Sequence, residues 1–117
     1  MIEKILEDMI ATVSGARAVI FLDGDGESIA QAGDDSVDMK FLGAWKEIHL
    51  DHIREITEKL GLGTVRAVLF SLEHGNELII PVVDEYSVLL LLSPYAGVQE
   101  AMGGAQRSIE ELRKEIS

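Results

Sequence analysis

The sequence predicts an α+β fold whose elements run in the order helix, strand, strand, helix, strand, strand, strand, helix. Three segments carry apolar residues at the spacing of an amphipathic helix, and five short runs are apolar enough to form strands. Turn-forming glycine, aspartate and asparagine separate most of these strands. Eight elements in 117 residues leave little chain for loops, so an elaborate active site is not expected.

The first third of the chain predicts a helix followed by a hairpin. Apolar residues between Ile2 and Val13 recur on one helix face, and Ser14-Gly15 ends the helix. The near-continuous apolar run Ala16 to Leu22 is typical of a strand buried on both faces. The turn Asp23 to Gly26 and the more polar strand Glu27 to Ala32 complete the hairpin, and we expect the second strand at a sheet edge.

The middle of the chain predicts one long helix, from about Val37 to Leu60. The preceding residues 33–36 supply an N-cap and negative charge, and Gly61-Leu62-Gly63 ends the helix. At 1.5 Å per residue the helix would be roughly 35 Å long. It carries two adjoining apolar stripes, which are Phe41, Trp45, Ile48, His52 and Ile56, and Leu42, His49, Ile53 and Leu60. A helix packed once on a sheet needs one stripe, so two stripes indicate that it is covered on two sides.

Three strands and a closing helix are predicted for the remainder. The strands are expected over Val65 to Glu73, Glu77 to Val83 and Tyr86 to Ser93, joined by short turns into an antiparallel meander. Pro81 lacks a ladder donor, so it predicts a bulge or an early end to the middle strand. The last helix carries apolar residues at helical spacing from Val98 to Ile116. A close backbone approach or a kink would explain the glycines at positions 103 and 104 inside it.

Composition excludes several classes of function. The net charge of −11 would repel the phosphate backbone of nucleic acids and anionic membranes. No apolar run approaches the roughly 20 residues that span a bilayer, so membrane insertion is not expected. There is no cysteine, and the first residues lack the basic start and apolar middle of a signal peptide. We therefore expect a cytoplasmic chain that forms one domain over residues 1–117.

No motif for metal, cofactor or catalysis is found, so we predict neither a cofactor nor an enzyme. Asp23-Gly24-Asp25-Gly26 is similar to the start of a calcium loop, but the residues after it look like a strand and favour a hairpin turn. His49 and His52 share a helix face without the further ligands that zinc needs. They are expected to be structural or to lie at an interface, where they would make a dimer pH-sensitive. Arg66 alternates with apolar neighbours, so we expect it to be an outward-facing strand residue and not an anion clamp.

Several stretches together resemble the roadblock family, which is named for a dynein light chain. The first hairpin is similar in Ser14 to Asp23, followed by Asp25-Gly26 and Ile29-Ala30. Further similar stretches are Leu60 to Gly63, Gly75 to Val82 and Asp84 to Leu91. The resemblance covers nearly the whole chain and suggests a stand-alone prokaryotic member. It implies a five-stranded antiparallel sheet with the long helix on one face and the terminal helices on the other.

The resemblance also implies how the chain would act. Roadblock domains commonly homodimerise through the long helix and the third strand, and prokaryotic members often regulate or scaffold small Ras-like GTPases. No catalytic residue is implied. The expected dimer interface comprises Leu42, Trp45, His49, His52, Ile53, Ile56, Val65, Ala67, Leu69 and Ser71. The expected partner-binding face of the long helix comprises Lys46, Glu47, Asp51, Arg54, Glu55 and Glu58.

A dimer has a physical logic, because an apolar third strand left as an exposed edge would be an aggregation hazard. Trp45 is either a core residue or an interface anchor. The leading hypothesis is a non-catalytic homodimeric regulator or scaffold of a small Ras-like GTPase. The alternatives are a structural dimerisation or scaffold module without a GTPase partner, and a small-ligand sensor domain.

Overall fold

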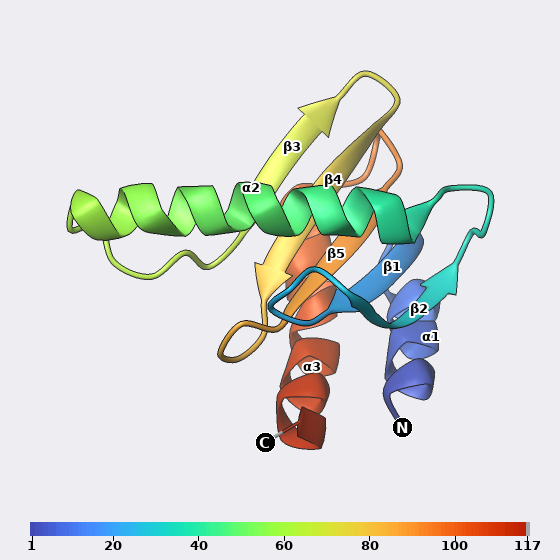
Figure 1. Cartoon of the computed structure of the whole chain (residues 1–117). Coiled ribbons are helices and arrows are strands. Elements are labelled where there is room, and N and C mark those ends of the chain that lie inside the picture. Colours follow the sequence, from blue (N-terminus) through green and yellow to red (C-terminus); the bar gives the residue numbers. More distant parts are fainter. Residues whose placement is uncertain (117) are drawn as a thin grey trace.

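The computed structural model describes residues 1–116, and the eight predicted elements are present in the predicted order (Figure 1). They are α1 (Ile2–Thr12), β1 (Ala16–Leu22), β2 (Ser28–Gly33), α2 (Met39–Lys59), β3 (Val68–Leu72), β4 (Gly75–Pro81), β5 (Ser87–Leu92) and α3 (Val98–Ile116). The strands form one sheet in the order β2-β1-β5-β4-β3, and every neighbouring pair is antiparallel. The predicted α+β fold, the meander and the edge position of the polar second strand are therefore confirmed.

The sheet lies between two helical layers, as the family resemblance implied. α2 crosses one face, and α1 and α3 cover the other (Figure 1). β1 shows the division residue by residue: Val19 and Phe21 pack in the core beneath α1 and α3, whereas Ala18, Ile20 and Leu22 pack in the core beneath α2. Successive strand residues point to opposite faces, so a strand buried on both sides reads as a continuous apolar run.

The face that α2 turns toward the sheet differs from the expectation. Its buried residues are Met39, Gly43, Glu47 and Leu50, and neither predicted stripe is the buried one. A Cβ added at Gly43 would lie 2.9 Å from Leu22 Cδ2, so glycine lets the helix backbone approach the sheet closely here. The packing surface of α2 therefore combines the apolar Met39 and Leu50 with a small residue and a charged one, which hydrophobic spacing does not reveal.

The turn at Asp23 has the predicted hairpin geometry. Asp23 Oδ1 accepts hydrogen bonds from the backbone N–H groups of Asp25 at 2.9 Å and Glu27 at 3.0 Å. Gly26 has φ of 78°, in the left-handed region that glycine favours. The carboxylate thus organises the turn, and the hairpin reading is confirmed. Within the described residues, none of the three helices combines the length and apolarity that crossing a bilayer demands.

β3 begins three residues later than predicted, and Pro81 supplies the reason. The register pairs Val68 with Ile79, so continuing it by two residues would place Arg66 opposite Pro81. Proline has no N–H to donate to the ladder. Residues 65–67 therefore leave the sheet, and β4 ends at Pro81, which confirms the predicted early end.

Two glycines give opposite expected effects on stability. Gly33 has φ of 95°, and an added Cβ would lie 2.4 Å from the carbonyl oxygen of Arg17, so Gly33→Ala should lower the free energy of unfolding by about 2 kcal/mol or more. Gly103 lies in α3 with nothing within 4 Å of an added Cβ, so Gly103→Ala should raise it by about 0.5–1 kcal/mol. Urea unfolding measures both, and equal effects would contradict this assignment.

Close packing does not explain the glycine pair in α3. A Cβ at Gly104 would meet Val13 Cγ2 at 3.6 Å, which is ordinary contact, and α3 is one continuous helix. The expected close approach or kink is therefore not required at either position.

Candidate protein-binding surface

The outer face of α2 carries a row of large apolar side chains, which we call the outer stripe. Its members are Phe41, Trp45, Ile48, His52 and Ile56. The exposed fractions of the four apolar members are 64%, 51%, 46% and 57% in chain order. The Phe41 and Trp45 rings meet edge to face, with centroids 6.4 Å apart. Contiguous exposed apolar side chains on one helix face indicate a surface that binds another protein.

The edge of the sheet beside α2 is also open. β3 is the terminal strand of the sheet and pairs only with β4, so the backbone groups on its other side have no strand partner among residues 1–116. Leu69 and Leu72 on β3 are 42% and 54% exposed. Phe70 links this edge to α2, because its ring lies 5.8 Å from that of His49. His49 and Phe70 therefore join α2 to β3, whereas Leu69, which alternates with Phe70 along the strand, points to the opposite face of the sheet.

Half of the predicted dimer residues are exposed on this surface. Trp45, His52, Ile56, Leu69 and Ser71 are exposed, whereas Leu42, His49, Ile53, Val65 and Ala67 are partly buried. Val65 packs with the core beneath α2, and Ala67 packs with the core on the opposite face, so these two do not share a face. The core interpretation of Trp45 is wrong, because about half of its surface is exposed.

The structure adds exposed apolar residues that the predicted interface set lacked. These are Phe41, Ile48, Leu60, Leu62 and Leu72. The 4-3-4-4 spacing of the outer stripe was a usable signal for Phe41 and Ile48, since residues so spaced share one helix face. Leu60 belongs to the second predicted stripe of the long helix, whereas Leu62 lies beyond the end of α2, where periodicity carries no information.

Two of the predicted partner-binding residues lie under the helix, so their expected exposure is wrong. Glu47 is 2% exposed, and its Oε2 accepts a hydrogen bond from Ser87 Oγ on β5 at 2.8 Å. Lys46 Nζ lies 2.9 Å from Glu77 Oε1 on β4 and 4.0 Å above the ring of Phe70. Polar groups at a helix–sheet interface are tolerated when each finds a partner, and here the sheet provides both partners.

Burial raises the pKa of Glu47 to about 7, although the hydrogen bond from Ser87 acts in the opposite direction. Asp51 and Glu85 raise this pKa further, while Arg54, whose Nη1 lies 3.9 Å from Glu47 Oε1, lowers it. Glu47 is therefore partly protonated near neutral pH. Sequence reasoning missed this group because its spacing matched a solvated helix face.

The other predicted partner-binding residues are more accessible. Asp51, Glu55 and Glu58 are exposed, and Arg54 is partly buried. Arg54 Nη1 lies 3.4 Å from Asp51, and Lys59 Nζ lies 3.1 Å from Glu55. These are surface ion pairs on a helix, each contributing about 0–1 kcal/mol. They leave an acidic flank along α2 beside the outer stripe.

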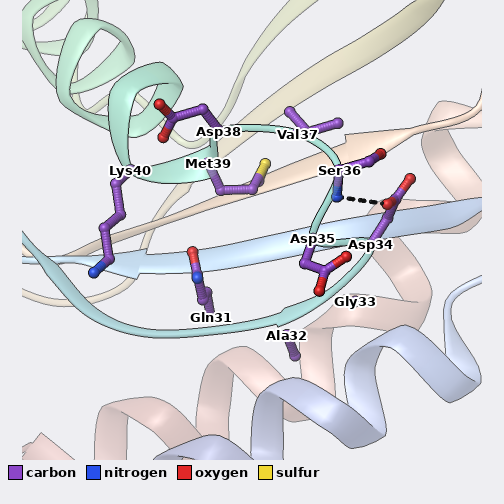
Figure 2. Close-up of a pocket in the computed structure, with 10 residues that line it drawn as sticks. All are labelled: Gln31, Ala32, Gly33, Asp34, Asp35, Ser36, Val37, Asp38, Met39 and Lys40. Carbon is purple, nitrogen blue, oxygen red and sulfur yellow. Dashed lines mark hydrogen bonds between the residues drawn. The ribbon is translucent and has the colours of Figure 1, made fainter.

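A hollow of about 580 Å³ lies where the chain enters α2, lined by residues 31–40 (Figure 2). The carboxylate of Asp34 accepts a hydrogen bond from the backbone N–H of Ser36 at 2.9 Å, and the Ser36 hydrogen bonds hold the pKa of Asp34 below its usual range. Asp38 caps α2 by accepting from the N–H of Phe41 at 3.1 Å. These acidic side chains thus shape the loop and start the helix.

The histidines do not converge. His49 is partly buried against Phe70, His52 is exposed on the outer stripe, and His74 lies in the β3–β4 turn. Among residues 1–116, no three histidine, aspartate or glutamate side chains gather in a way that could hold a metal ion.

Solved structures of the same shape come from roadblock proteins. MglB from Myxococcus xanthus superposes with a TM-score of 0.90 at 13% identity, covering 98% of this chain and 94% of MglB. A roadblock/LC7 domain from Streptomyces avermitilis gives 0.89 at 15% identity, covering 97% and 96%. An MglB structure described as having a tetrameric arrangement gives 0.85 at 14% identity, covering 97% and 85%.

Sequence comparison adds no further match. No protein-family model matches the chain, and a search of curated proteins finds no significant similarity. The matched structures have low sequence identity to this chain, so they show its fold and do not show its activity. The fold of the matched structures nevertheless agrees, over nearly the whole chain, with the fold that the motifs of the first hairpin and the later strands predicted. On this evidence the chain has the roadblock/LC7 fold.

Proposed function

We propose that this chain is a non-catalytic homodimeric regulator or scaffold of a small Ras-like GTPase, acting as one roadblock-like domain over residues 1–117. The observation that carries the proposal is the outer stripe of α2 beside the open edge of β3. The exposed side chains of the outer stripe are mainly apolar, like the core of a protein–protein interface. The roadblock/LC7 fold and the family resemblance support the assignment of the partners.

A second copy of the chain is the occupant proposed for the outer stripe and the β3 edge. A twofold axis that brings α2 to α2 and β3 to β3 makes the same surface serve both copies. A net charge of −11 makes two copies of the chain repel each other. Attraction between them is therefore expected from apolar contacts, and the outer stripe exposes apolar side chains. A lasting dimer should bury roughly 1,200–2,000 Å² in total. The tetrameric arrangement described for one MglB structure supports self-association on this fold.

The GTPase is proposed to contact the acidic flank of α2. Asp51, Glu55 and Glu58 are exposed beside the outer stripe, so they remain available when the apolar side chains are covered. Clustered carboxylates attract a basic partner surface and speed its association. The chain binds the GTPase in this proposal and supplies no group to the chemistry of hydrolysis.

Retention of a GTPase on immobilised chain tests this assignment. Ras-like GTPases from the same genome, loaded with GDP or with a non-hydrolysable GTP analogue, should be retained in one nucleotide state more than in the other. The double variant Asp51→Lys, Glu55→Lys should reduce retention at least about tenfold, because it reverses charge at the contact. Glu111→Lys on α3 is the matched control and should retain the GTPase.

The same assay separates the alternatives. A regulator changes the rate at which the GTPase hydrolyses GTP in solution, and a scaffold binds without changing that rate. A dimeric chain that retains no Ras-like GTPase in either state would support the structural dimerisation module and overturn the GTPase assignment.

A further inference from the structure

Three arginines converge on one pocket at the end of the sheet. The pocket has a volume of about 470 Å³ and lies between α2, residues 64–66, the end of β4 and α3. Arg54, Arg66 and Arg113 line it from three different parts of the chain, and Asp84 is the one acidic residue in its wall. The whole chain has 10 lysines and arginines against 21 acidic residues, so three arginines in one wall are a local concentration of basic side chains, although Arg54 and Arg113 have carboxylate partners.

The pocket exists because β3 and β4 separate. Pro81 prevents the ladder from continuing past Val68, and residues 65–67 run apart from β4 instead of pairing with it. Figure 1 shows the connection from α2 to β3 as a loop without strand structure, and Val65 and Ala67 at its end pack against the two cores. Residues 80–83 and Val65 then line the pocket instead of closing on each other.

The three guanidinium groups differ in how they are held. Arg113 Nε donates a hydrogen bond to the carbonyl oxygen of Val82 at 3.1 Å, and its Nη1 contacts Glu110. Arg54 contacts Asp51 through Nη1 at 3.4 Å. Arg66 is exposed, and the part of the chain that the structure describes offers it no hydrogen bond or ion pair. Two arginines are therefore fixed in place beside a third whose donors are free for an anion.

The rest of the lining is mainly aliphatic. Val65, Ile80, Val82, Met102 and Ile109 form much of the wall. A second hollow of about 550 Å³ shares Arg54, Thr64 and Val65 with the first and continues along the end of α2. The combined groove is longer than a free phosphate or carboxylate needs, and it offers apolar contacts that such ions cannot use.

We propose that this groove, the arginine groove, binds an extended acidic peptide segment of a partner protein, with carboxylates on the arginines and apolar side chains against the aliphatic wall. Arginine pairs with carboxylates through two parallel N–H donors, so it selects for them more strongly than lysine. The site is separate from the outer stripe of α2, although Val65 belongs to the expected dimer interface, and Arg54 and Glu58 to the expected partner-binding face.

Fluorescence anisotropy with three short labelled peptides tests the proposal on the full chain. One peptide alternates glutamate and leucine, the second replaces glutamate by glutamine, and the third replaces leucine by glycine. The glutamate–leucine peptide should bind at least about tenfold more tightly than either of the others. Equal binding of the glutamate–glycine peptide would show an anion site without an apolar component, and it would overturn the proposal, as would absence of binding.

Matched variants locate the binding. Arg66→Gln removes the unpaired guanidinium and should weaken the glutamate–leucine peptide about tenfold, as expected for a charge-assisted hydrogen bond. Arg107→Gln is the control, because this arginine is 92% exposed on α3, pairs with Glu111 and does not line the groove. Equal weakening by both variants would indicate non-specific attraction and contradict the site. Trp45→Glu should leave peptide binding unchanged, which keeps this test independent of dimerisation.

Discussion

Trp45→Glu is expected to convert a dimeric chain into a monomer. Trp45 is half-exposed at the centre of the outer stripe, so the change should not disturb the folded monomer. Truncating a central interface tryptophan commonly costs about 2–4 kcal/mol of binding free energy, and a buried carboxylate adds its desolvation cost. The dissociation constant should therefore rise at least about 100-fold. Light scattering after size exclusion should show the mass falling from twice 12.8 kDa to 12.8 kDa.

Tyr95→Glu is the matched control for this experiment. Tyr95 is 95% exposed in the loop between β5 and α3, so it offers the same kind of substitution away from the outer stripe. Leu69→Lys tests the contribution of the β3 edge, since a lysine on an edge strand disfavours pairing with another strand. A wild-type chain that is monomeric at micromolar concentration, or a Trp45→Glu variant that dimerises as tightly as Tyr95→Glu, would overturn the proposed dimer.

Glu47→Gln is expected to stabilise the chain above pH 7 and to flatten the dependence of its stability on pH. The pKa of Glu47 is raised from 4.5 to about 7, mainly by burial. Between these values the folded chain holds a proton that the unfolded chain releases, so the free energy of unfolding falls as pH rises through this window. Above pH 7 the loss is complete and amounts to about 3 kcal/mol.

Glutamine keeps an oxygen that can accept the hydrogen bond from Ser87, but it carries no charge to desolvate. The variant should therefore exceed the wild type by about 1–3 kcal/mol at pH 8 and differ little at pH 4.5. Urea unfolding at fixed protein concentration measures this, because the proposed dimerisation would make apparent stability depend on concentration.

Glu55→Gln on the same helix is the control for a general charge effect. Its side chain is 62% exposed, so the change should stay within about 0.5 kcal/mol at every pH. If the free energy of unfolding of Glu47→Gln changed with pH as steeply as that of the wild type, Glu47 would not be the group responsible for the pH dependence. Because Glu47 lies on the opposite side of α2 from the outer stripe, the oligomeric state should be the same in both variants.

The elements of this fold are local properties of the sequence, and the sequence predicted them well. The apolar run from Ala16 to Leu22 indicated a strand buried on both faces, and β1 contributes side chains to both cores. Asp23 and Gly26 indicated a hairpin turn, because a carboxylate acceptor and a left-handed glycine build it from neighbouring residues. Such features depend on residues a few positions apart, so periodicity and turn chemistry contain the necessary information.

The site was predicted only in part. The outer stripe was recognisable from its spacing, but the sequence could not say that this stripe faces outward. The resemblance placed the expected interface on α2 and β3, and half of the residues that it named are exposed in the structure. Lys46 and Glu47 were placed on the wrong side, since a charged residue on a helix is usually solvated.

By itself the sequence determined the order and type of the elements, because each follows from contacts within a few residues. Only the tertiary structure decided which side of α2 packs, because partly buried Lys46 and buried Glu47 contact Glu77 and Ser87, residues 31 and 40 positions away. Burying a charge requires a partner, and the close approach of the helix to the sheet requires a small residue, here Gly43. The local hydrophobic pattern shows neither requirement. When both are met, the less apolar side of the helix packs on the sheet and the more apolar side is left exposed.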